Sequence, residues 1–174
     1  MTIDVINKIK VIKVENETQL SLVKPLLKDY KDSLSLYLNI SDLKKELKYF
    51  NREFNTMQLE CIVPFDFLFL ALSDNKIAAA CIALKKINTE ICELKRLYVK
   101  PCFRKNGLGE ILCITVIEKA VMMNYKKIVL DTCSTMLEAI ALYKSLGFKE
   151  YKQPIKNCIH DTLCMELSLT NKIY

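Results

Sequence analysis

The residue types most suited to chemistry gather in one stretch, Glu93 to Leu112, which holds two of the chain's three glycines, Gly107 and Gly109. Glycine makes up about 7% of an average chain, so two glycines this close in a glycine-poor sequence indicate a place where a Cβ would collide with a neighbour or a bound ligand. The same stretch has five basic residues and no acidic one between positions 94 and 109, namely Lys95, Arg96, Lys100, Arg104 and Lys105. Most of the formal net charge of +6 therefore lies in this segment.

The stretch has the pattern of a strand, a short basic loop and the start of a helix. A helix N-terminus presents unpaired backbone N–H groups and the positive end of the helix dipole, and both favour a phosphate. The nucleotide P-loop pattern GxxxxGK[ST] and the dinucleotide pattern GxGxxG are absent, and the loop instead reads RxxGxG. The segment therefore predicts a phosphate-binding loop of another kind, made by Arg104, Lys105, Asn106, Gly107, Leu108 and Gly109.

Composition limits the classes to which the protein can belong. With 174 residues and 51% hydrophobic residues, the chain is expected to form one domain, residues 1–174, with its own core. The eight cysteines form no CxxC pair and His160 is the single histidine, so no metal site is predicted. Neither a signal peptide nor an apolar run of membrane-spanning length is recognised. We therefore expect a cytoplasmic protein whose cysteines are reduced, and no association with a membrane.

Hydrophobic periodicity and turn residues predict an alternation of strands and helices. In chain order we expect strand 8–14, helix 17–37, a helix beginning at Ser41, strands 66–72, 77–85 and 91–99, helix 108–123, strand 127–131, helix 135–146, and strands 148–151 and 163–169. Pro25 is expected at a break or first turn of its helix, and Ser41 is expected to cap the next one.

Local signals also predict how the later helices begin and end. Asn124 is expected to end its helix in a left-handed conformation, and Thr135 with Glu138 has the spacing of a capping box. Gly147 stands where a Schellman motif needs a glycine, with Phe148 folding back onto the preceding helix.

Three blocks, ELKRLYVKP, RKNGLG and ALYKSLGF, together with LDT at 130–132, are similar to the signature of the GNAT superfamily, the acetyl-coenzyme A dependent N-acetyltransferases. The resemblance covers roughly Phe67 to Leu169. It implies a single α/β domain with a mixed, mostly antiparallel sheet of about seven strands and helices on both faces. The helical pair at 17–60 resembles that of small microbial members and would form the acceptor side, beside a core at 65–169.

The same resemblance implies a reaction and a co-substrate. The protein would move an acetyl or short acyl group from coenzyme A to a primary amine by direct attack, without a metal. The RxxGxG loop, Arg104 to Gly109, would hold the pyrophosphate, and Leu97, Tyr98 and Val99 would lie along the pantetheine arm. The chain departs from many relatives at Met136, where an asparagine usually contacts the cofactor.

Acetyl transfer needs a neutral, deprotonated amine as nucleophile and a proton for the leaving thiolate. Glu93 resembles the base position of members that acetylate lysine, and Tyr143 matches the tyrosine that serves the family as general acid. A carboxylate on an apolar strand is costly to bury, which would raise the pKa of Glu93. The alternative roles are structural: Glu93 could pair with Lys95 or another neighbour, and Tyr143 could be a core aromatic.

Two alternatives to an enzyme stay open at this point. One is a non-catalytic module that binds or senses acyl-coenzyme A; the other is an RNA-binding or protein-binding surface. Nucleic acid is not expected, because the basic segment has few interleaved aromatic residues beyond Tyr98 and Phe103. The acceptor, a small-molecule or protein amine, is not specified by any motif in 17–60 or 151–163, and a homodimer is neither predicted nor excluded.

Overall fold

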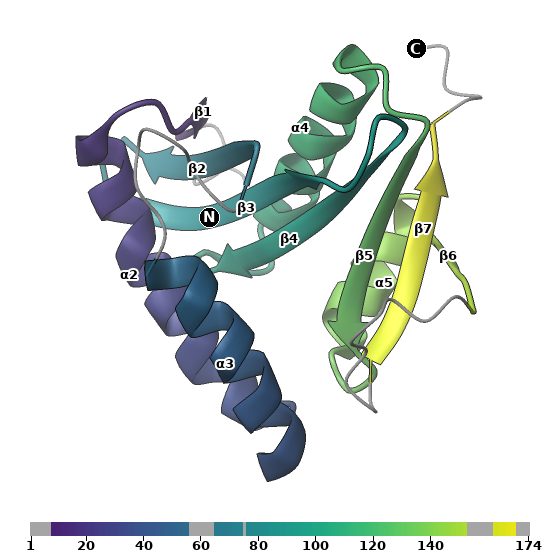
Figure 1. Cartoon of the computed structure of the whole chain (residues 1–174). Coiled ribbons are helices and arrows are strands. Elements are labelled where there is room, and N and C mark those ends of the chain that lie inside the picture. Colours follow the sequence, from purple (N-terminus) through teal and green to yellow (C-terminus); the bar gives the residue numbers. More distant parts are fainter. Residues whose placement is uncertain (1–7, 56–64, 75, 153–161, 170–174) are drawn as a thin grey trace.

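The structure is a computed structural model that describes residues 8–55, 65–74, 76–152 and 162–169. Its centre is a seven-stranded sheet in the order β1-β2-β3-β4-β5-β7-β6, drawn in Figure 1. Every neighbouring pair is antiparallel except β4 and β5, which are parallel. The strands are β1 (Ile9–Lys13), β2 (Phe67–Ser73), β3 (Ala78–Lys86), β4 (Ile91–Val99), β5 (Lys127–Cys133), β6 (Lys149–Glu150) and β7 (Thr162–Ser168).

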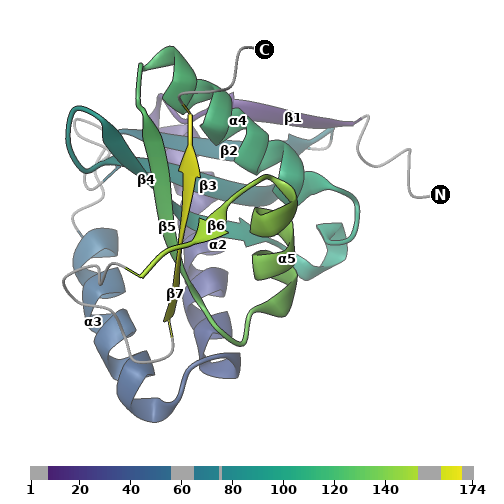
Figure 2. The same cartoon turned by 90° about the vertical axis from the view of Figure 1, so that its right-hand side faces the viewer.

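Helices cover both faces of this sheet, as Figure 2 makes visible. They are α2 (Glu17–Ser33), α3 (Ile40–Asn55), α4 (Leu108–Met122) and α5 (Leu137–Ser145), with short 3-10 turns η1 (Leu34–Leu36) and η2 (Pro101–Phe103). One apolar layer joins α4 and α5 to the sheet, and a second joins α2 and α3 to the opposite face. The predicted single α/β domain with a mostly antiparallel sheet is therefore confirmed. Within the described ranges, no helix has the length and apolar character needed to cross a membrane.

The parallel pair at the centre of the sheet is short. β4 pairs with β5 only where Ile91–Glu93 faces Lys127–Val129. Beyond this point β4 continues along β3 while β5 continues along β7, so the two strands separate, as Figure 1 shows. A β-bulge in β4 lies next to the separation, because Arg96 and Leu97 together oppose one residue of β3. Arg96 has a φ of 57°, and the bulge turns its side chain toward α3.

Three expectations about the N-terminal helices are wrong. Asn39, and not Ser41, caps α3, since its side-chain oxygen accepts a hydrogen bond from the Asp42 N–H at 3.0 Å. Pro25 lies inside α2 without breaking it. The missing proline N–H is offset by the packing of the same helix against the sheet, where Leu26 and Leu27 are buried. The predicted helix 17–37 also ends earlier, at Ser33.

Two of the three expectations about later helix ends are confirmed. Asn124 has a φ of 60° after α4. Gly147 has a φ of 92°, and Phe148 donates its N–H to Tyr143 O at 3.0 Å, as a Schellman motif requires. The capping box is wrong. The Thr135 hydroxyl donates to Tyr37 O at 3.0 Å and so joins the start of α5 to the segment that follows α2.

Candidate functional site

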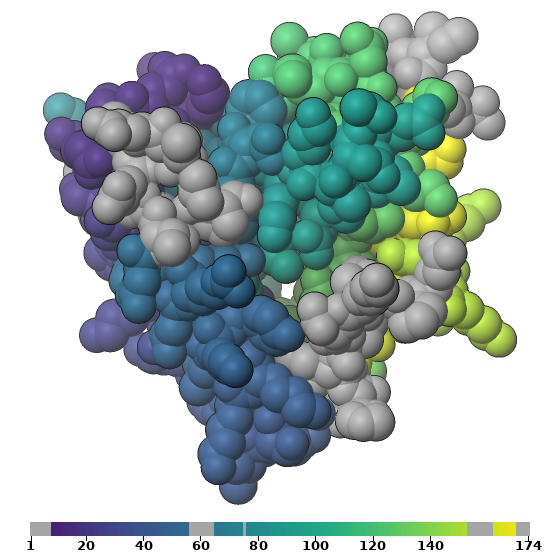
Figure 3. Space-filling view, viewed as in Figure 1, coloured from purple at the N-terminus to yellow at the C-terminus, as the bar shows by residue number. Residues whose placement is uncertain are grey.

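Two cavities meet where β4 and β5 separate. The larger, called here the outer groove, has a volume of about 700 Å³ and lies between the end of β4, the start of α4 and α5. The smaller, called the inner cleft, has a volume of about 100 Å³ and lies between β4, β5, α2 and α3. In Figure 3 a narrow opening is visible on this side, beside the blue surface of α3. The two cavities share four wall residues, Tyr30, Leu97, Met136 and Ala139.

The outer groove brings together most of the residues that the sequence assigned to the coenzyme. Its walls include Leu97, Tyr98, Val99, Arg104, Lys105, Gly107, Leu108 and Gly109. Asn106, also predicted, is not among the lining residues; its side-chain amide donates to Phe103 O at 3.4 Å and closes the loop instead.

The start of α4 offers backbone donors to this groove. Lys105 and Gly107 have left-handed φ values of 60° and 75°, which turn the loop into the helix. The first hydrogen bond within the helix runs from Ile111 N–H to Gly107 O, so the preceding N–H groups of α4 lack a partner in the helix. Because Leu108 and Gly109 line the groove, an anion in it would meet both these donors and the positive end of the helix dipole.

Two side-chain details refine the predicted loop. The Arg104 Nε donates to Val99 O at 2.9 Å, and its guanidinium lies 5.9 Å from the Tyr98 ring centroid, so this side chain folds over the end of β4. A Cβ on Gly109 would lie 3.3 Å from Leu142 Cδ2. The sequence predicted that a neighbour or a bound ligand comes close to this glycine, and in the structure the close neighbour is Leu142 of α5.

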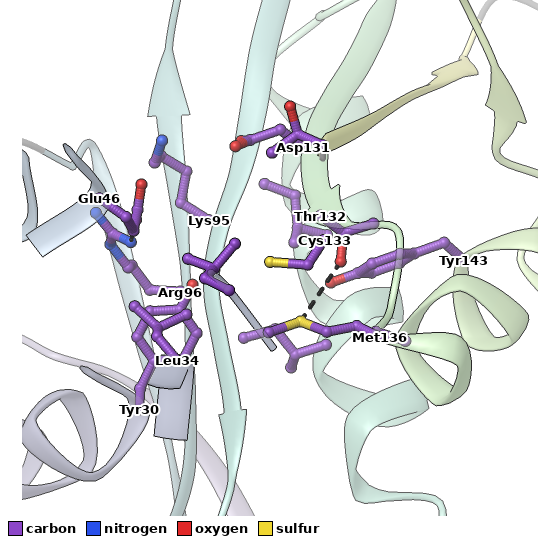
Figure 4. A pocket seen from close by; sticks show the side chains of 15 residues that line it. Tyr30, Leu34, Glu46, Lys95, Arg96, Asp131, Thr132, Cys133, Met136 and Tyr143 are labelled. Carbon is purple, nitrogen blue, oxygen red and sulfur yellow. Dashed lines mark hydrogen bonds and ion pairs between the residues drawn. The ribbon is translucent and has the colours of Figure 1, made fainter. Parts of the chain in front are cut away.

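The inner cleft has two chemically different ends, drawn in Figure 4. The charged end is formed by Glu46, Lys95, Arg96 and Asp131. The apolar end is formed by Leu34, Leu38, Cys133 and Met136. Tyr143 reaches into the same cleft from α5.

Arg96 fixes one wall of the cleft. Its Nη1 donates to Glu46 at 2.8 Å and its Nε to Glu53 at 3.1 Å, and Nη2 also contacts Glu53. The guanidinium stacks over the rings of Phe50 and Tyr30 at 4.9 and 5.6 Å, and its side chain is 4% exposed. All three guanidinium nitrogens are thus engaged, and they join α3 to β4.

Glu93 is buried beside Lys95, with the Lys95 Nζ 3.2 Å from its carboxylate. Burial raises the pKa of Glu93, an effect that the Lys95 ammonium partly opposes. Burial by itself lowers the Lys95 pKa, but Asp131 and Glu93 raise it above its ordinary value, so Lys95 stays cationic. Glu93 occupies the last position at which β4 pairs with β5, and it is not among the residues that line either cavity. Its carboxylate therefore adjoins the cleft through Lys95.

The surroundings of Tyr143 are compatible with both readings that the sequence left open. Its ring packs against Phe148 with centroids 5.8 Å apart, as a core aromatic does, and it also lines the inner cleft. Burial raises the pKa of the Tyr143 phenol well above its usual value. The phenol is therefore protonated at neutral pH and is able to donate a proton or a hydrogen bond.

Sequence reasoning missed several residues of the inner cleft. Asp131 is an exposed carboxylate that borders the charged end, and the signal for it was an acid within the apolar strand KIVLDTC. Arg96 was noticed only as one charge among five. Met136, noted as a departure from the family pattern, borders both cavities, and its Sδ accepts a 3.7 Å hydrogen bond from the Thr132 hydroxyl. In the described part of the chain, no cluster of three or more His, Cys, Asp or Glu residues is placed to hold a metal.

Comparisons with known proteins agree with this geometry. A model of the Acetyltransferase (GNAT) family matches residues 27–148. An uncharacterised N-acetyltransferase of Schizosaccharomyces pombe is 31% identical over 147 residues, covering 82% of this chain and 86% of the relative. The N-acetylaspartate synthetase of Xenopus tropicalis is 28% identical over 115 residues, covering 58% of this chain and 42% of its own length.

Among solved structures, the PaiA N-acetyltransferase of Thermoplasma acidophilum in complex with coenzyme A has the same fold. It superposes with a TM-score of 0.72 at 17% identity and covers 92% of this chain and 98% of its own. A GNAT acetyltransferase of Staphylococcus aureus superposes with a TM-score of 0.72 at 18% identity. With its fold, its loop and the family match over most of its length, the chain belongs to the acetyltransferase (GNAT) family.

Proposed function

We propose that this protein transfers an acetyl group from acetyl-coenzyme A to a primary amine by direct attack. The observation that carries the proposal is the meeting of the two cavities where β4 and β5 separate. A thioester whose coenzyme lies in the outer groove would place its carbonyl at the shared wall, within reach of an amine in the inner cleft. Binding both reactants at one junction converts a bimolecular step into a positioned one.

On the donor side, the residues that would hold the coenzyme are mainly backbone groups. The unpaired N–H groups at the start of α4 would bind the pyrophosphate, with Arg104 and Lys105 nearby as cations. Leu97 and Val99 lie in the part of β4 that has no β5 partner, so the pantetheine arm would contact backbone groups on that side of the strand. Val99 O already accepts a hydrogen bond from Arg104 Nε. We assign the coenzyme site to these residues together with Tyr98, Gly107, Leu108 and Gly109.

For the chemical step, acetyl-coenzyme A supplies a thioester whose carbonyl carbon forms a C–N bond with the amine while its C–S bond breaks. Tyr143 would give its phenolic proton to the leaving thiolate, and its raised pKa keeps that proton available at neutral pH. Glu93 would receive the proton lost by the amine, by way of water or the neighbouring Lys95. The raised pKa of Glu93 brings this carboxyl closer to the range suited to a base.

The acceptor is proposed to be a small amine or a protein amine that enters from the charged end of the inner cleft. Lys95 and Asp131 put charges of both signs there, which suits an acceptor bearing an amine and a carboxylate. The similarity to proteins named N-acetylaspartate synthetase makes an amino acid one acceptor to test. The proposal includes a cytoplasmic location, supported by the free thiols of Cys81, Cys92, Cys102 and Cys113.

The second candidate is a protein that binds acyl-coenzyme A without transferring the acyl group. The observation that favours it is the position of Glu93, which does not line either cavity. In that case the outer groove would bind acyl-coenzyme A, and the inner cleft would not bind an acceptor or support transfer.

Two measurements distinguish these candidates. Coenzyme A at about 100 times its dissociation constant should stabilise the protein by about 2.7 kcal/mol if the outer groove binds it. Release of free thiol from acetyl-coenzyme A, followed with amino acids, polyamines and peptides as acceptors, then separates transfer from binding. Stabilisation without acceptor-dependent thiol release would favour the binding module, and absence of stabilisation would contradict both candidates.

Tyr143→Phe tests the proposed general acid. The variant keeps the ring that packs against Phe148 and removes the proton donor, so folding should change little while turnover falls. The loss should be smaller with an acyl donor whose leaving thiol has a lower pKa, because that thiolate needs less help. Equal losses with good and poor leaving groups would restrict Tyr143 to positioning the thioester.

A further inference from the structure

On the basis of the proposed function, we propose that Met136 limits the acyl donor to short chains by closing the apolar end of the inner cleft. The family match specifies an acetyltransferase but not the length of chain that this protein accepts. The residues around Met136 supply that missing information.

Met136 stands between the two cavities. It is one of four residues that line both the outer groove and the inner cleft, and it lies at the N-terminal end of α5. An acyl group that passes from the groove into the cleft would therefore run along its side chain. In Figure 4 the Met136 sulfur lies beneath Cys133 and beside Tyr143, the residue that we propose as proton donor to the leaving thiolate.

The Met136 side chain is held in this position. Its Sδ accepts the Thr132 hydroxyl at 3.7 Å, its N–H donates to Cys133 O at 2.9 Å, and its carbonyl accepts the N–H of Ile140 at 3.0 Å. Methionine is ordinarily one of the more adaptable side chains in a protein interior. Contacts at both the backbone and the sulfur reduce that freedom, so the side chain acts as a wall.

The size of the inner cleft leaves little room behind this wall. Its volume is about 100 Å³, against about 700 Å³ for the outer groove, so it is the narrower of the two cavities. It has to hold the acyl group and also the attacking nitrogen. Leu34 and Leu38 close the apolar end and are 1% and 9% exposed, so a longer chain would need one of them or Met136 to move.

The different chemistry of the two ends of the inner cleft determines where the acyl chain of the donor would lie. At the charged end, an acyl chain would lie against Lys95 and Asp131 and remove their solvation, at a cost in free energy. At the apolar end, it would meet the side chains of Leu34, Leu38 and Met136. The acyl chain is therefore directed to the apolar end, and Met136 sets its length.

The test measures binding and needs no acceptor. Affinities of acetyl-, propionyl-, butyryl- and hexanoyl-coenzyme A are measured by calorimetry for the wild type, Met136→Ala and Met136→Leu. We expect wild-type affinity to fall by at least about tenfold between propionyl and hexanoyl, since one methylene too many in a fitted pocket is worth about 10- to 200-fold. Met136→Ala should bring hexanoyl-coenzyme A to within about threefold of acetyl-coenzyme A, and Met136→Leu, which conserves volume, should keep the wild-type limit.

Met122→Ala is the matched control, because this methionine is 73% exposed on α4 and lines neither cavity; it should leave the length profile unchanged. A wild type that binds all four thioesters equally, or a Met136→Ala profile identical to the wild type, would overturn the proposal. If Met136→Ala fails to fold, the wild-type and Met136→Leu profiles still decide it. Failure to bind any of the thioesters would overturn this proposal and the proposed function together. A length profile without acetylation of any amine would support this proposal and contradict acetyl transfer alone.

Discussion

The outer groove and the inner cleft are built in different ways. The phosphate-binding part of the groove comes from one continuous segment, the end of β4 through the first turn of α4, and backbone groups do most of the proposed work. The cleft is formed by side chains of α2, α3, β4, β5 and α5, and those side chains carry paired charges. The groove should therefore respond chiefly to changes of backbone conformation or of one cation, whereas the cleft should respond to changes of single side chains.

The largest effect is expected from Glu93→Gln, on the cleft side. If Glu93 is the base, the rate of transfer should fall by about 10²- to 10⁴-fold, because the amine loses its proton acceptor. The affinity for coenzyme A should change little, since Glu93 does not line the groove. Steady-state kinetics and calorimetry measure the two quantities. Glu90→Gln, an exposed glutamate paired with Lys126, is the control; a rate for Glu93→Gln within a few-fold of that control would leave Glu93 a structural role.

The pH dependence sharpens this test. Because the pKa of Glu93 is raised, the acidic limb of the rate profile should lie above the ordinary glutamate range and should disappear in Glu93→Gln. The free energy of unfolding should also depend on the ionisation of Glu93, but it should decrease with rising pH where the rate increases. The contribution of Glu93 is fully present below the unfolded-state pKa and is lost as pH rises through the raised folded-state pKa. Denaturant unfolding across this range should therefore show a smaller fall in stability for Glu93→Gln than for the wild type.

The next effect is on folding. Arg96→Met should destabilise the protein by about 3–5 kcal/mol, because Glu46 and Glu53 would keep their charges without the cation that both contact. Lys48→Met, an exposed change on the same helix, is the control and should be nearly neutral. Combining Arg96→Met with Glu53→Gln should recover part of the loss, which a double-mutant cycle measures. An Arg96→Met variant as stable as the Lys48 control would show that α3 does not depend on this contact.

A smaller effect is expected in the groove, from Arg104→Ala. Loss of one charge-assisted contact should weaken coenzyme A binding by about 1.5–3 kcal/mol, measured by calorimetry. Folding stability should change little, because the Arg104 side chain is on the surface. Lys100→Ala removes a cation from the same basic segment without touching the groove and should have a smaller effect. Equal affinities for the two variants would mean that only the net charge of the segment matters.

The smallest effects separate the two glycines of the loop. Gly107→Ala should cost about 1–2 kcal/mol of stability and weaken coenzyme binding, because Gly107 has a φ of 75° that a Cβ disfavours. Gly109→Ala should change stability by about 1 kcal/mol or less, since its Cβ meets the flexible end of Leu142 at 3.3 Å and Val99 Cγ2 at an ordinary 3.9 Å, and alanine favours the helix. Thermal or denaturant unfolding measures both variants. The reverse order would mean that the approach of α5 to Gly109 is the tighter constraint.

The sequence by itself determined the parts of the protein that follow local rules. The RxxGxG loop, the left-handed Asn124 and the Schellman motif at Gly147 each depend on residues within one turn of each other. The order of strands and helices followed from hydrophobic periodicity, and it led to the family and the fold. The prediction was wrong where a distant hydrogen-bond partner replaced the local one. The Thr135 hydroxyl donates to Tyr37 O, far away in the chain, and does not cap its own helix.

Only the tertiary structure decided the inner cleft. Arg96 meets Glu46 and Glu53 across 50 and 43 positions of sequence, and no periodicity predicts such a contact. Asp131 on β5 and Lys95 on β4 interact electrostatically across the gap that opens where β4 and β5 stop pairing after Glu93. The place where that pairing ends is a property of strand register. Local patterns specify backbone conformation, whereas the neighbours of a side chain are fixed by how distant elements pack. For that reason the sequence located the loop of the groove that we propose for the donor, and the folded chain was needed to find the cleft that we propose for the acceptor.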